Sequence, residues 1–278
     1  MSFSSLKPTL PRLQRSAVAL ALVAFGASAS ALPLFTVDAD PTAAVRAVQA
    51  DNILISDFAR VMTSGTSFTE SGFLSVTDLQ LGGVTVANSG VGSTYNMYVE
   101  FAGSGSLSLA GNPSTSPTFG SFQTLTYNLY GYGGTVATFG VTSAGATVNG
   151  NLANVTPGTV GVTGETLLAT GTLVSGTVST TPGPGEKFSP SASTLLTFNL
   201  TDAGKGVFIA PNPFYSMAFA SFTNSPSQVG LFDGGFTISQ GGGSINFTTP
   251  IPEPETYALM LAGLAAVGFV ARRRRPQA

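Results

Sequence analysis

The chain has 278 residues, only 9% of them charged, and it contains no cysteine, histidine or tryptophan. These absences exclude Ser-His-Asp and Cys-His catalysis, ordinary zinc, copper and iron sites, and the tryptophan platforms on which sugars stack. The body from residue 32 to 251 has 4 basic and 11 acidic residues, so it cannot neutralise a row of phosphates, and nucleic-acid binding is excluded.

The first 31 residues predict a signal peptide. An apolar stretch at 17–26 follows three basic residues, Lys7, Arg12 and Arg15. The sequence Ala29-Ser30-Ala31 then matches the small-residue cleavage signal. We expect export through the Sec translocon, with the mature chain beginning at Leu32.

Residues 32–249 predict one extracellular all-β domain. The body is long enough to fold on a hydrophobic core without disulfides. Glycine and proline recur between segments rich in Thr, Val, Phe and Tyr, which is typical of short strands joined by turns. About a dozen strands at a spacing near ten residues indicate a two-sheet β-sandwich with a jelly-roll-like arrangement. The expected strands are 52–58, 68–76, 84–87, 94–101, 105–109, 122–130, 135–141, 166–178, 194–200, 206–209, 217–223, 236–240 and 244–248.

Three other segments of the body have distinct patterns. Pro41–Gln49 predicts a short helix, because proline stands in its first turn and alanines follow. Thr142–Gly164 predicts a long hairpin or an excursion from the core, and Thr180–Lys187 predicts an exposed loop. In the strand at 95–101, residues Tyr95, Met97, Val99 and Phe101 should face the core and the alternate side chains should face solvent.

The densest acidic region could supply oxygen ligands to Ca²⁺. It comprises Asp38, Asp40, Asp51, Asn52 and Asp57. No EF-hand loop or acidic repeat surrounds these residues, and turn capping explains them more simply. We therefore expect no metal and no cofactor.

Three glutamates, Glu70, Glu100 and Glu165, are scattered along the body. A glycosidase would need two carboxylates at a set separation, but no local signature surrounds any of the three. Isolated exposed glutamates are the simpler interpretation, and we expect no catalytic residues.

The most aromatic segment is Asn212–Asn224. Its residues Phe214, Tyr215, Phe219 and Phe222 could line a sugar groove, but a strand buried on both faces fits the pattern better. The Gly241–Gly243 run predicts a chain reversal between two strands and lacks the context of a phosphate-binding loop.

The C-terminal segment 250–275 has three consecutive parts. Pro252-Glu253-Pro254 breaks any helix entering from the body. Residues 256–271 are uncharged and predict a short transmembrane helix, and Arg272, Arg273, Arg274 and Arg275 form a basic tail that should stay cytoplasmic. The apolar run is shorter than the roughly 20 residues that span a bilayer comfortably, which disfavours a permanent anchor without excluding it.

These three parts, in this order, resemble the PEP-CTERM domain, the bacterial tail recognised by a membrane-embedded exosortase. The resemblance implies that Pro252, Glu253 and Pro254 are the recognition element. It also implies an intermediate in the inner membrane of a Gram-negative bacterium, followed by delivery to the cell surface or extracellular matrix.

The body also resembles the flocculation-associated PEP-CTERM proteins. The matching segments are 50–53, 68–70, 95–98, 101–105, 208–228, 234–236 and 240–244. This resemblance implies a non-enzymatic protein that promotes flocculation or biofilm cohesion with extracellular polysaccharide. A carbohydrate-binding lectin-like module, or a glycan hydrolase, is the alternative.

Overall fold

A computed structural model divides the chain into two compact units, Met1–Leu32 and Pro33–Ala278. The structure describes residues 32–38, 47–108, 113–133, 137–148 and 165–248, together with residue 264. The predicted signal peptide and nearly all of the sorting segment, including the expected membrane helix at 256–271, lie outside these ranges. Within them, no helix is long and apolar enough to cross a membrane.

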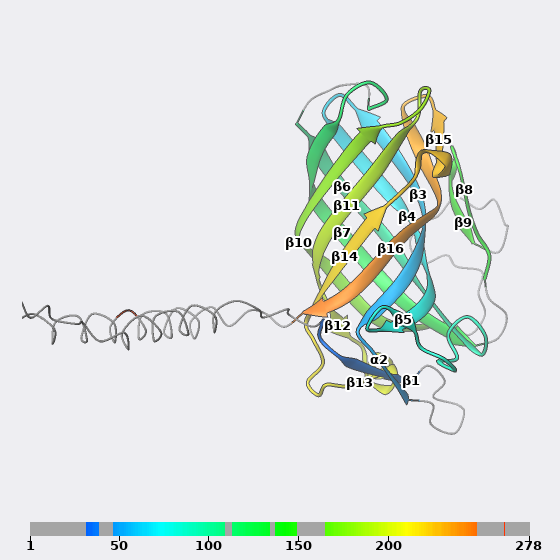
Figure 1. The fold of residues 1–278 in the computed structure, drawn as a ribbon, viewed down its shortest axis with the longest axis vertical. Helices are drawn as coiled ribbons and strands as arrows, with labels where there is room; N and C mark the ends of the chain where they lie inside the picture. Colours follow the sequence, from blue (N-terminus) through cyan, green and yellow to red (C-terminus); the bar gives the residue numbers. More distant parts are fainter. Residues whose placement is uncertain are drawn as a thin grey trace, which may run out of the picture. The chain divides into compact units, whose positions relative to one another are not determined.

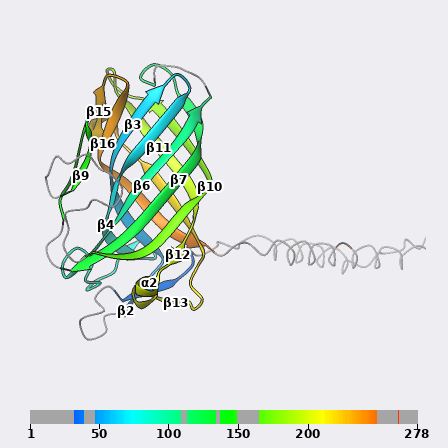
Figure 2. The ribbon, with the colours of Figure 1, turned by 180° about the vertical axis from the view of Figure 1, so that it is seen from behind.

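Eight long antiparallel strands form one sheet that closes into a barrel (Figures 1 and 2). Each strand pairs with the next one along the chain, and the last pairs with the first. The all-β prediction is confirmed. The strands are β3 (Asn52–Ser64), β4 (Ser67–Leu81), β6 (Tyr95–Leu107), β7 (Thr118–Gly133), β10 (Thr166–Pro182), β11 (Phe188–Thr197), β14 (Met217–Thr223) and β16 (Gly235–Thr248).

The predicted two-sheet sandwich is wrong, because a single sheet curls until β10 pairs with β11 and β16 pairs with β3. Alternating strands look the same in a sandwich and a barrel, so local pattern does not separate the two. Register shifts accompany the curvature, for example between Leu173 and Ser175 and between Ser239 and Gly241. Such bulges bend a strand and increase its twist.

The barrel interior is apolar and its inward-facing side chains form the main core. Met97 and Val99 on β6 face inward as predicted, and Ile53 and Ile55 on β3 join them in the core. The outer face of β6 was expected to meet solvent, but Tyr98 is fully buried there. The hairpin of β8 (Phe139–Thr142) and β9 (Gly145–Val148) packs over this side of the barrel and covers it.

This hairpin begins at Phe139 and overlaps only the first part of the segment 142–164 for which a hairpin or an excursion was predicted, and residues 149–164 lie outside the described ranges. The short strand β5 (Val84–Thr85) pairs with β4, and the short strand β15 (Val229–Phe232) pairs with β16, both antiparallel. A single 3-10 turn, η2 (Pro226–Gln228), precedes β15. The predicted reversal at Gly241–Gly243 is wrong, because these glycines lie inside the continuous strand β16.

A small three-stranded sheet closes one end of the barrel (Figures 1 and 2). It consists of β1 (Phe35–Asp38), β2 (Ala47–Ala50) and β13 (Phe208–Ala210). The predicted helix at Pro41–Gln49 is wrong in its described part, since residues 47–49 belong to β2 and pair with β1. Pairing buries Ala50 opposite Phe35, and this tertiary burial outweighs the weak propensity of so short a helix.

Aromatic rings fill the space between this small sheet and the barrel. The Phe247 ring contacts those of Phe35, Phe198 and Phe214 with centroids 4.8 to 4.9 Å apart, mostly edge to face. Aromatic pairs in this arrangement add about 0.5–1.5 kcal/mol beyond burial. This end of the barrel is therefore sealed.

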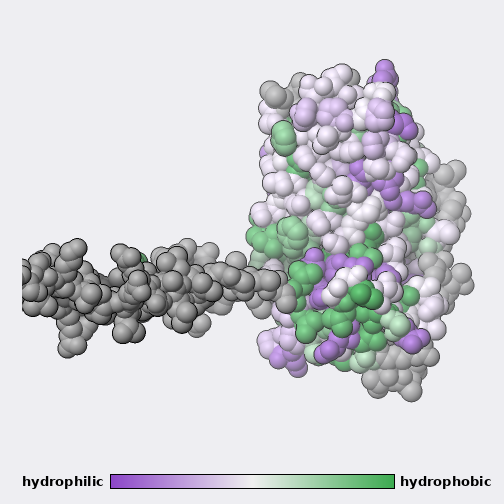
Figure 3. All heavy atoms as spheres, in the orientation of Figure 1, coloured by the Kyte–Doolittle hydropathy of each residue, from purple (hydrophilic) through white to green (hydrophobic). Residues whose placement is uncertain are grey.

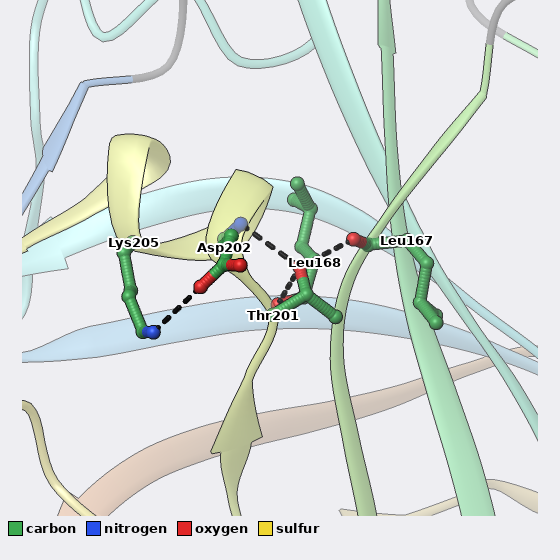
Figure 4. Close-up of polar contacts among 6 residues, drawn as sticks. Leu167, Leu168, Thr201, Asp202 and Lys205 are labelled. Carbon is green, nitrogen blue, oxygen red and sulfur yellow. Dashed lines mark hydrogen bonds and ion pairs between the residues drawn. The ribbon is translucent and has the colours of Figure 1, made fainter.

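The short helix α2 (Asp202–Val207) follows β12 (Asn199–Leu200) at the same end. Figure 4 shows Thr201 at its start, where the hydroxyl accepts a hydrogen bond from the Gly204 N–H and donates to the Leu167 carbonyl. Lys205 forms an exposed ion pair with Asp202 at 2.7 Å. The threonine cap fixes the helix against β10.

Candidate functional site

The inward faces of the barrel strands enclose a cavity of about 470 Å³. Its walls are mainly aliphatic and aromatic, with residues such as Met97, Val99 and Phe122. Phe198 and Phe247 bound it at the sealed end, and residues in the turns at the opposite end complete the lining. Eight strands give an interior just wide enough to be filled by side chains or to hold one small ligand.

Two carboxyl groups interrupt the apolar lining that the strands provide, and Glu186 adds a third near the turns. Asp57 is 3% exposed and points inward from β3, where its Oδ1 atom has no hydrogen-bond partner. Glu70 points inward from β4 and is partly exposed to the cavity. The two residues lie diagonally across the β3–β4 ladder, on either side of the small pair Ala59 and Gly72.

Burial perturbs both carboxyl groups. It raises the pKa of Asp57 well above its usual value, and the negative charge of Glu70 raises it further. Burial also raises the pKa of Glu70 to about 7. Perturbed carboxyls in a cavity mark a candidate functional site. Among the described residues that line the cavity, none is basic.

Asn224 brings a third oxygen to the same part of the wall. It is buried beyond the end of β14, and its Oδ1 atom has no hydrogen-bond partner. Gly241 pairs with Asp57 across β16 and β3, and a Cβ atom at Gly241 would lie 2.0 Å from the Asn224 Oδ1. A bulge at Gln240, whose φ is +57°, sets this register. Glycine at 241 therefore leaves the space that the amide occupies.

The distribution of charged residues on the barrel strands changes sharply around the circumference of the barrel. Five neighbouring strands, β7, β10, β11, β14 and β16, contain no charged residue, and we call them the uncharged wall. Figure 3 shows the upper part of the wall facing the viewer in mostly pale colours, neither strongly hydrophilic nor hydrophobic. Hydroxyl residues align across it in register, in the order Ser121, Thr177, Ser193, Ser221 and Ser244.

A hollow of about 240 Å³ lies on this wall over β7, β10 and β11. Hydroxyl residues line it, namely Thr177, Ser179, Ser191 and Ser193. The Ser179 and Ser191 hydroxyls are hydrogen-bonded at 2.7 Å. Phe119 borders the hollow and is 61% exposed. The hollow thus combines an exposed aromatic ring with uncharged hydrogen-bonding groups.

The covered side of the barrel holds a tyrosine cluster beneath the β8–β9 hairpin. Tyr98 stacks on Tyr130 with ring centroids 5.2 Å apart, and its hydroxyl donates to Glu165 Oε2 at 2.7 Å. Burial and this carboxylate raise the pKa of Tyr98, while burial and the negative charge of Glu100 raise that of Tyr130. Glu100 and Glu165 therefore share these outer surroundings, whereas Glu70 faces the interior, and the three glutamates do not form one site.

The residues considered for calcium do not converge. Asp51 Oδ2 accepts a hydrogen bond from the Gly82 N–H at 2.8 Å, and the Asn52 amide donates to Gln80. Asp57 instead faces the cavity. Within the described ranges, no three acidic residues gather in a way that could hold a metal ion. Asp40 lies outside those ranges.

The aromatic segment at 212–224 divides between two places. Phe214 and Tyr215 join the aromatic contacts at the sealed end, and Phe222 faces the cavity. Phe219 is 41% exposed on the uncharged wall, so the prediction of a strand buried on both faces is wrong. None of these rings borders the hollow beside Phe119.

Sequence reasoning missed the site formed by Asp57, Glu70 and Asn224. A signal was present, because Asp57 follows Ile53 and Ile55 on the apolar face of an alternating strand, and Glu70 follows Phe68 in the same way. A carboxylate at an inward position needs a structural or functional reason. The predicted sorting residues Pro252–Pro254 and Arg272–Arg275, and the cleavage residues Ala29 and Ala31, lie outside the described ranges.

Comparison with known proteins identifies one feature of the chain. No curated protein and no solved structure matches it. A family model of the PEP-CTERM protein-sorting motif matches residues 250–275. This motif implies export across the membrane to the cell surface of a Gram-negative bacterium, with exosortase as the processing partner. By its C-terminal motif, the chain is a PEP-CTERM protein.

Proposed function

We propose that this protein is a non-enzymatic component of the cell surface or extracellular matrix that contacts exopolysaccharide and promotes flocculation or biofilm cohesion. The Sec translocon exports it, the membrane holds it transiently, and exosortase acts on its tail. The hollow beside Phe119 on the uncharged wall is the observation that carries the polysaccharide contact.

The chemistry of this hollow suits a sugar. An exposed aromatic ring offers a flat apolar face, and surrounding hydroxyls can donate and accept hydrogen bonds. Thr177, Ser191 and Ser193 supply such hydroxyls beside Phe119. The uncharged wall also presents no charge that would repel an anionic polymer. Neutral and anionic polysaccharides can therefore approach it closely.

Cosedimentation with the cell's own exopolysaccharide tests this proposal. Phe119→Ala should lower the binding constant about five-fold, since stacking on one ring contributes about 1 kcal/mol. Phe219→Ala is the matched control, because Phe219 is an exposed phenylalanine on the same wall that does not border the hollow. Equal binding by wild type and both variants would contradict a contact at the hollow.

A lectin-like module specific for one sugar is the second candidate, and the defined hollow favours it. Such a module would bind a particular oligosaccharide with saturation, whereas a matrix component would bind the polymer through many weak contacts. Binding of a glycan array by the wild type, compared with Phe119→Ala, separates the two. A hydrolase is less favoured, because none of the three glutamates borders the hollow: Glu70 faces the interior, and Glu165 accepts a hydrogen bond from the buried Tyr98 hydroxyl.

A further inference from the structure

We infer that the barrel interior is a binding site for a small, mostly apolar molecule that carries a protonated amine. The site would be separate from the polysaccharide contact, because it lies inside the barrel and the hollow beside Phe119 lies outside it. Either one can fail without the other.

The size and lining of the cavity indicate the size and apolar character of the ligand's body. A volume of about 470 Å³ falls within the range of small-molecule sites. Val99, Phe122 and Leu125 on β6 and β7 face Ala192, Ala218 and Ile245 on the other side. An alkyl chain or ring of about eight to twelve carbons would bury its apolar surface there, and burial of apolar surface favours binding.

The polar groups in the cavity wall indicate the chemistry of the ligand's polar head group. The Asp57 carboxyl and the Asn224 amide are each 3% exposed, and the Oδ1 atom of each has no donor. Glu70 adds a second carboxyl group from β4. An ionised carboxylate only accepts hydrogen bonds, and a buried acceptor without a donor is destabilising. The Oδ1 atoms of Asp57 and Asn224 therefore lack a donor, and an ammonium group brings three.

Charge supports the same assignment. The described lining holds Asp57 and Glu70 in the wall and Glu186 near the turns, and it holds no lysine or arginine. Arg60 is not available to neutralise them, since its Nε donates to the Ser143 carbonyl beneath the outer hairpin. Buried charges are ordinarily paired, so a cationic ligand would supply the missing partner.

The local backbone is built around this cluster. The bulge at Gln240 places Gly241 opposite Asp57, and the absent side chain at 241 admits the Asn224 amide. Bulges often re-aim side chains near functional sites. Between the two carboxyls stand Ala59 and Gly72, where a Cβ atom at 72 would meet the Phe58 carbonyl at 2.2 Å. Small residues thus keep the space between the acidic groups open.

Isothermal titration tests the assignment with three probes that share one chain length. Octylamine, 1-octanol and octanoate are titrated at pH 8 into the protein purified without detergent from exosortase-competent cells. We expect octylamine to bind at least about ten-fold more tightly than 1-octanol, which corresponds to 1.4 kcal/mol. We expect octanoate not to bind, because two carboxyls would repel it.

Three variants locate the site. Asp57→Asn combined with Glu70→Gln should make octylamine and 1-octanol bind equally, because the charge is gone and the apolar lining remains. Ala218→Leu fills the cavity and should weaken both probes, and Ala218 does not border the hollow. Asp202→Asn removes an exposed carboxylate on α2 and should change neither.

Several results would overturn the assignment. Equal binding of octylamine and 1-octanol to the wild type would show that the cavity does not recognise the amine. An amine preference that survives the double substitution would show that residues other than Asp57 and Glu70 recognise it. Octylamine binding unaffected by Ala218→Leu would mean a surface site. A calcium titration that saturates, is lost in the double variant and is accompanied by no amine preference would replace the amine with a metal ion.

Discussion

The uncharged wall and the side of the barrel formed by β3, β4 and β6 are built from the same alternation but bury different faces. On β3, β4 and β6 the outer face is covered by the β8–β9 hairpin, so Phe73 and Tyr98 are buried outside the barrel. On the uncharged wall, hydroxyl residues occupy the outer face away from the hairpin, whereas Tyr130 and Tyr132 near the end of β7 belong to the cluster beneath it. All charged residues of the eight barrel strands lie on the covered side, namely Asp57, Arg60, Glu70, Asp78 and Glu100.

The difference indicates a division of labour. The covered side has two buried faces and can hold perturbed groups such as Asp57 and Glu70 in the interior. The open side presents a neutral surface on which Phe119 and its neighbours can meet a polymer. If the two sides have these separate roles, substitutions on each side should have different effects.

The largest effect should come from the uncharged wall at Gly171. A Cβ atom there would lie 2.0 Å from the Thr197 carbonyl and 2.2 Å from the Tyr127 ring. Gly171→Ala should therefore disrupt the closure between β10 and β11 and destabilise the protein by about 5 kcal/mol or more. Thermal unfolding followed by circular dichroism measures this. The control is Gly206→Ala, where a Cβ atom meets nothing within 4 Å, and equal melting of the two variants would contradict the packing at Gly171.

Two outward-facing phenylalanines compare the sides directly. Phe73 on β4 is 1% exposed, and Phe219 on β14 is 41% exposed. Phe73→Ala should cost about 3–5 kcal/mol because it empties the cluster beneath the hairpin, while Phe219→Ala should cost about 1 kcal/mol or less. Denaturant unfolding gives both values. Similar costs would mean that the hairpin does not cover β4 in solution.

The buried carboxyls predict a stability that falls as pH rises. The pKa of Glu70 is raised from 4.5 to about 7 by burial, so between these values the folded protein holds more protons than the unfolded chain. The contribution of Glu70 is complete below pH 4.5 and is lost as pH rises through about 7, by roughly 3 kcal/mol at most. Glu70→Gln should flatten this dependence in urea unfolding at pH 5 and pH 8. A wild type that becomes more stable from pH 5 to pH 8 would reverse the sign and contradict the burial.

The smallest effect should appear at Arg60, which ties the hairpin to the barrel. Its Nε donates to the Ser143 carbonyl at 2.7 Å, and its guanidinium lies 5.4 Å from the Phe232 ring centroid. Arg60→Ala should cost about 1 kcal/mol and should speed amide hydrogen exchange in 139–148 more than in β10 or β11. Unchanged exchange in the hairpin would show that Arg60 does not hold it.

Local sequence patterns predicted much of this structure, but the features that depend on long-range strand pairing could not be predicted from them. Alternation at 95–101 predicted which side chains face the core, because period-two burial is a property of the strand itself. The barrel closes through pairs such as Gly235 with Met62, which no local window contains. For the same reason, the site formed by Asp57, Glu70 and Asn224 could not be predicted from the sequence. Asp57 was grouped with its acidic neighbours in sequence, whereas Glu70 lies on β4 and Asn224 follows the end of β14. The sorting motif was found because all its parts are consecutive.

The most direct test of the account is the intact mass of the protein recovered from the extracellular fraction, with and without exosortase. We expect a barrel lacking everything beyond about Pro254, released only when exosortase is present. An unprocessed C-terminus in both strains would contradict it, because the barrel would then remain joined to its sorting segment and could not enter the matrix.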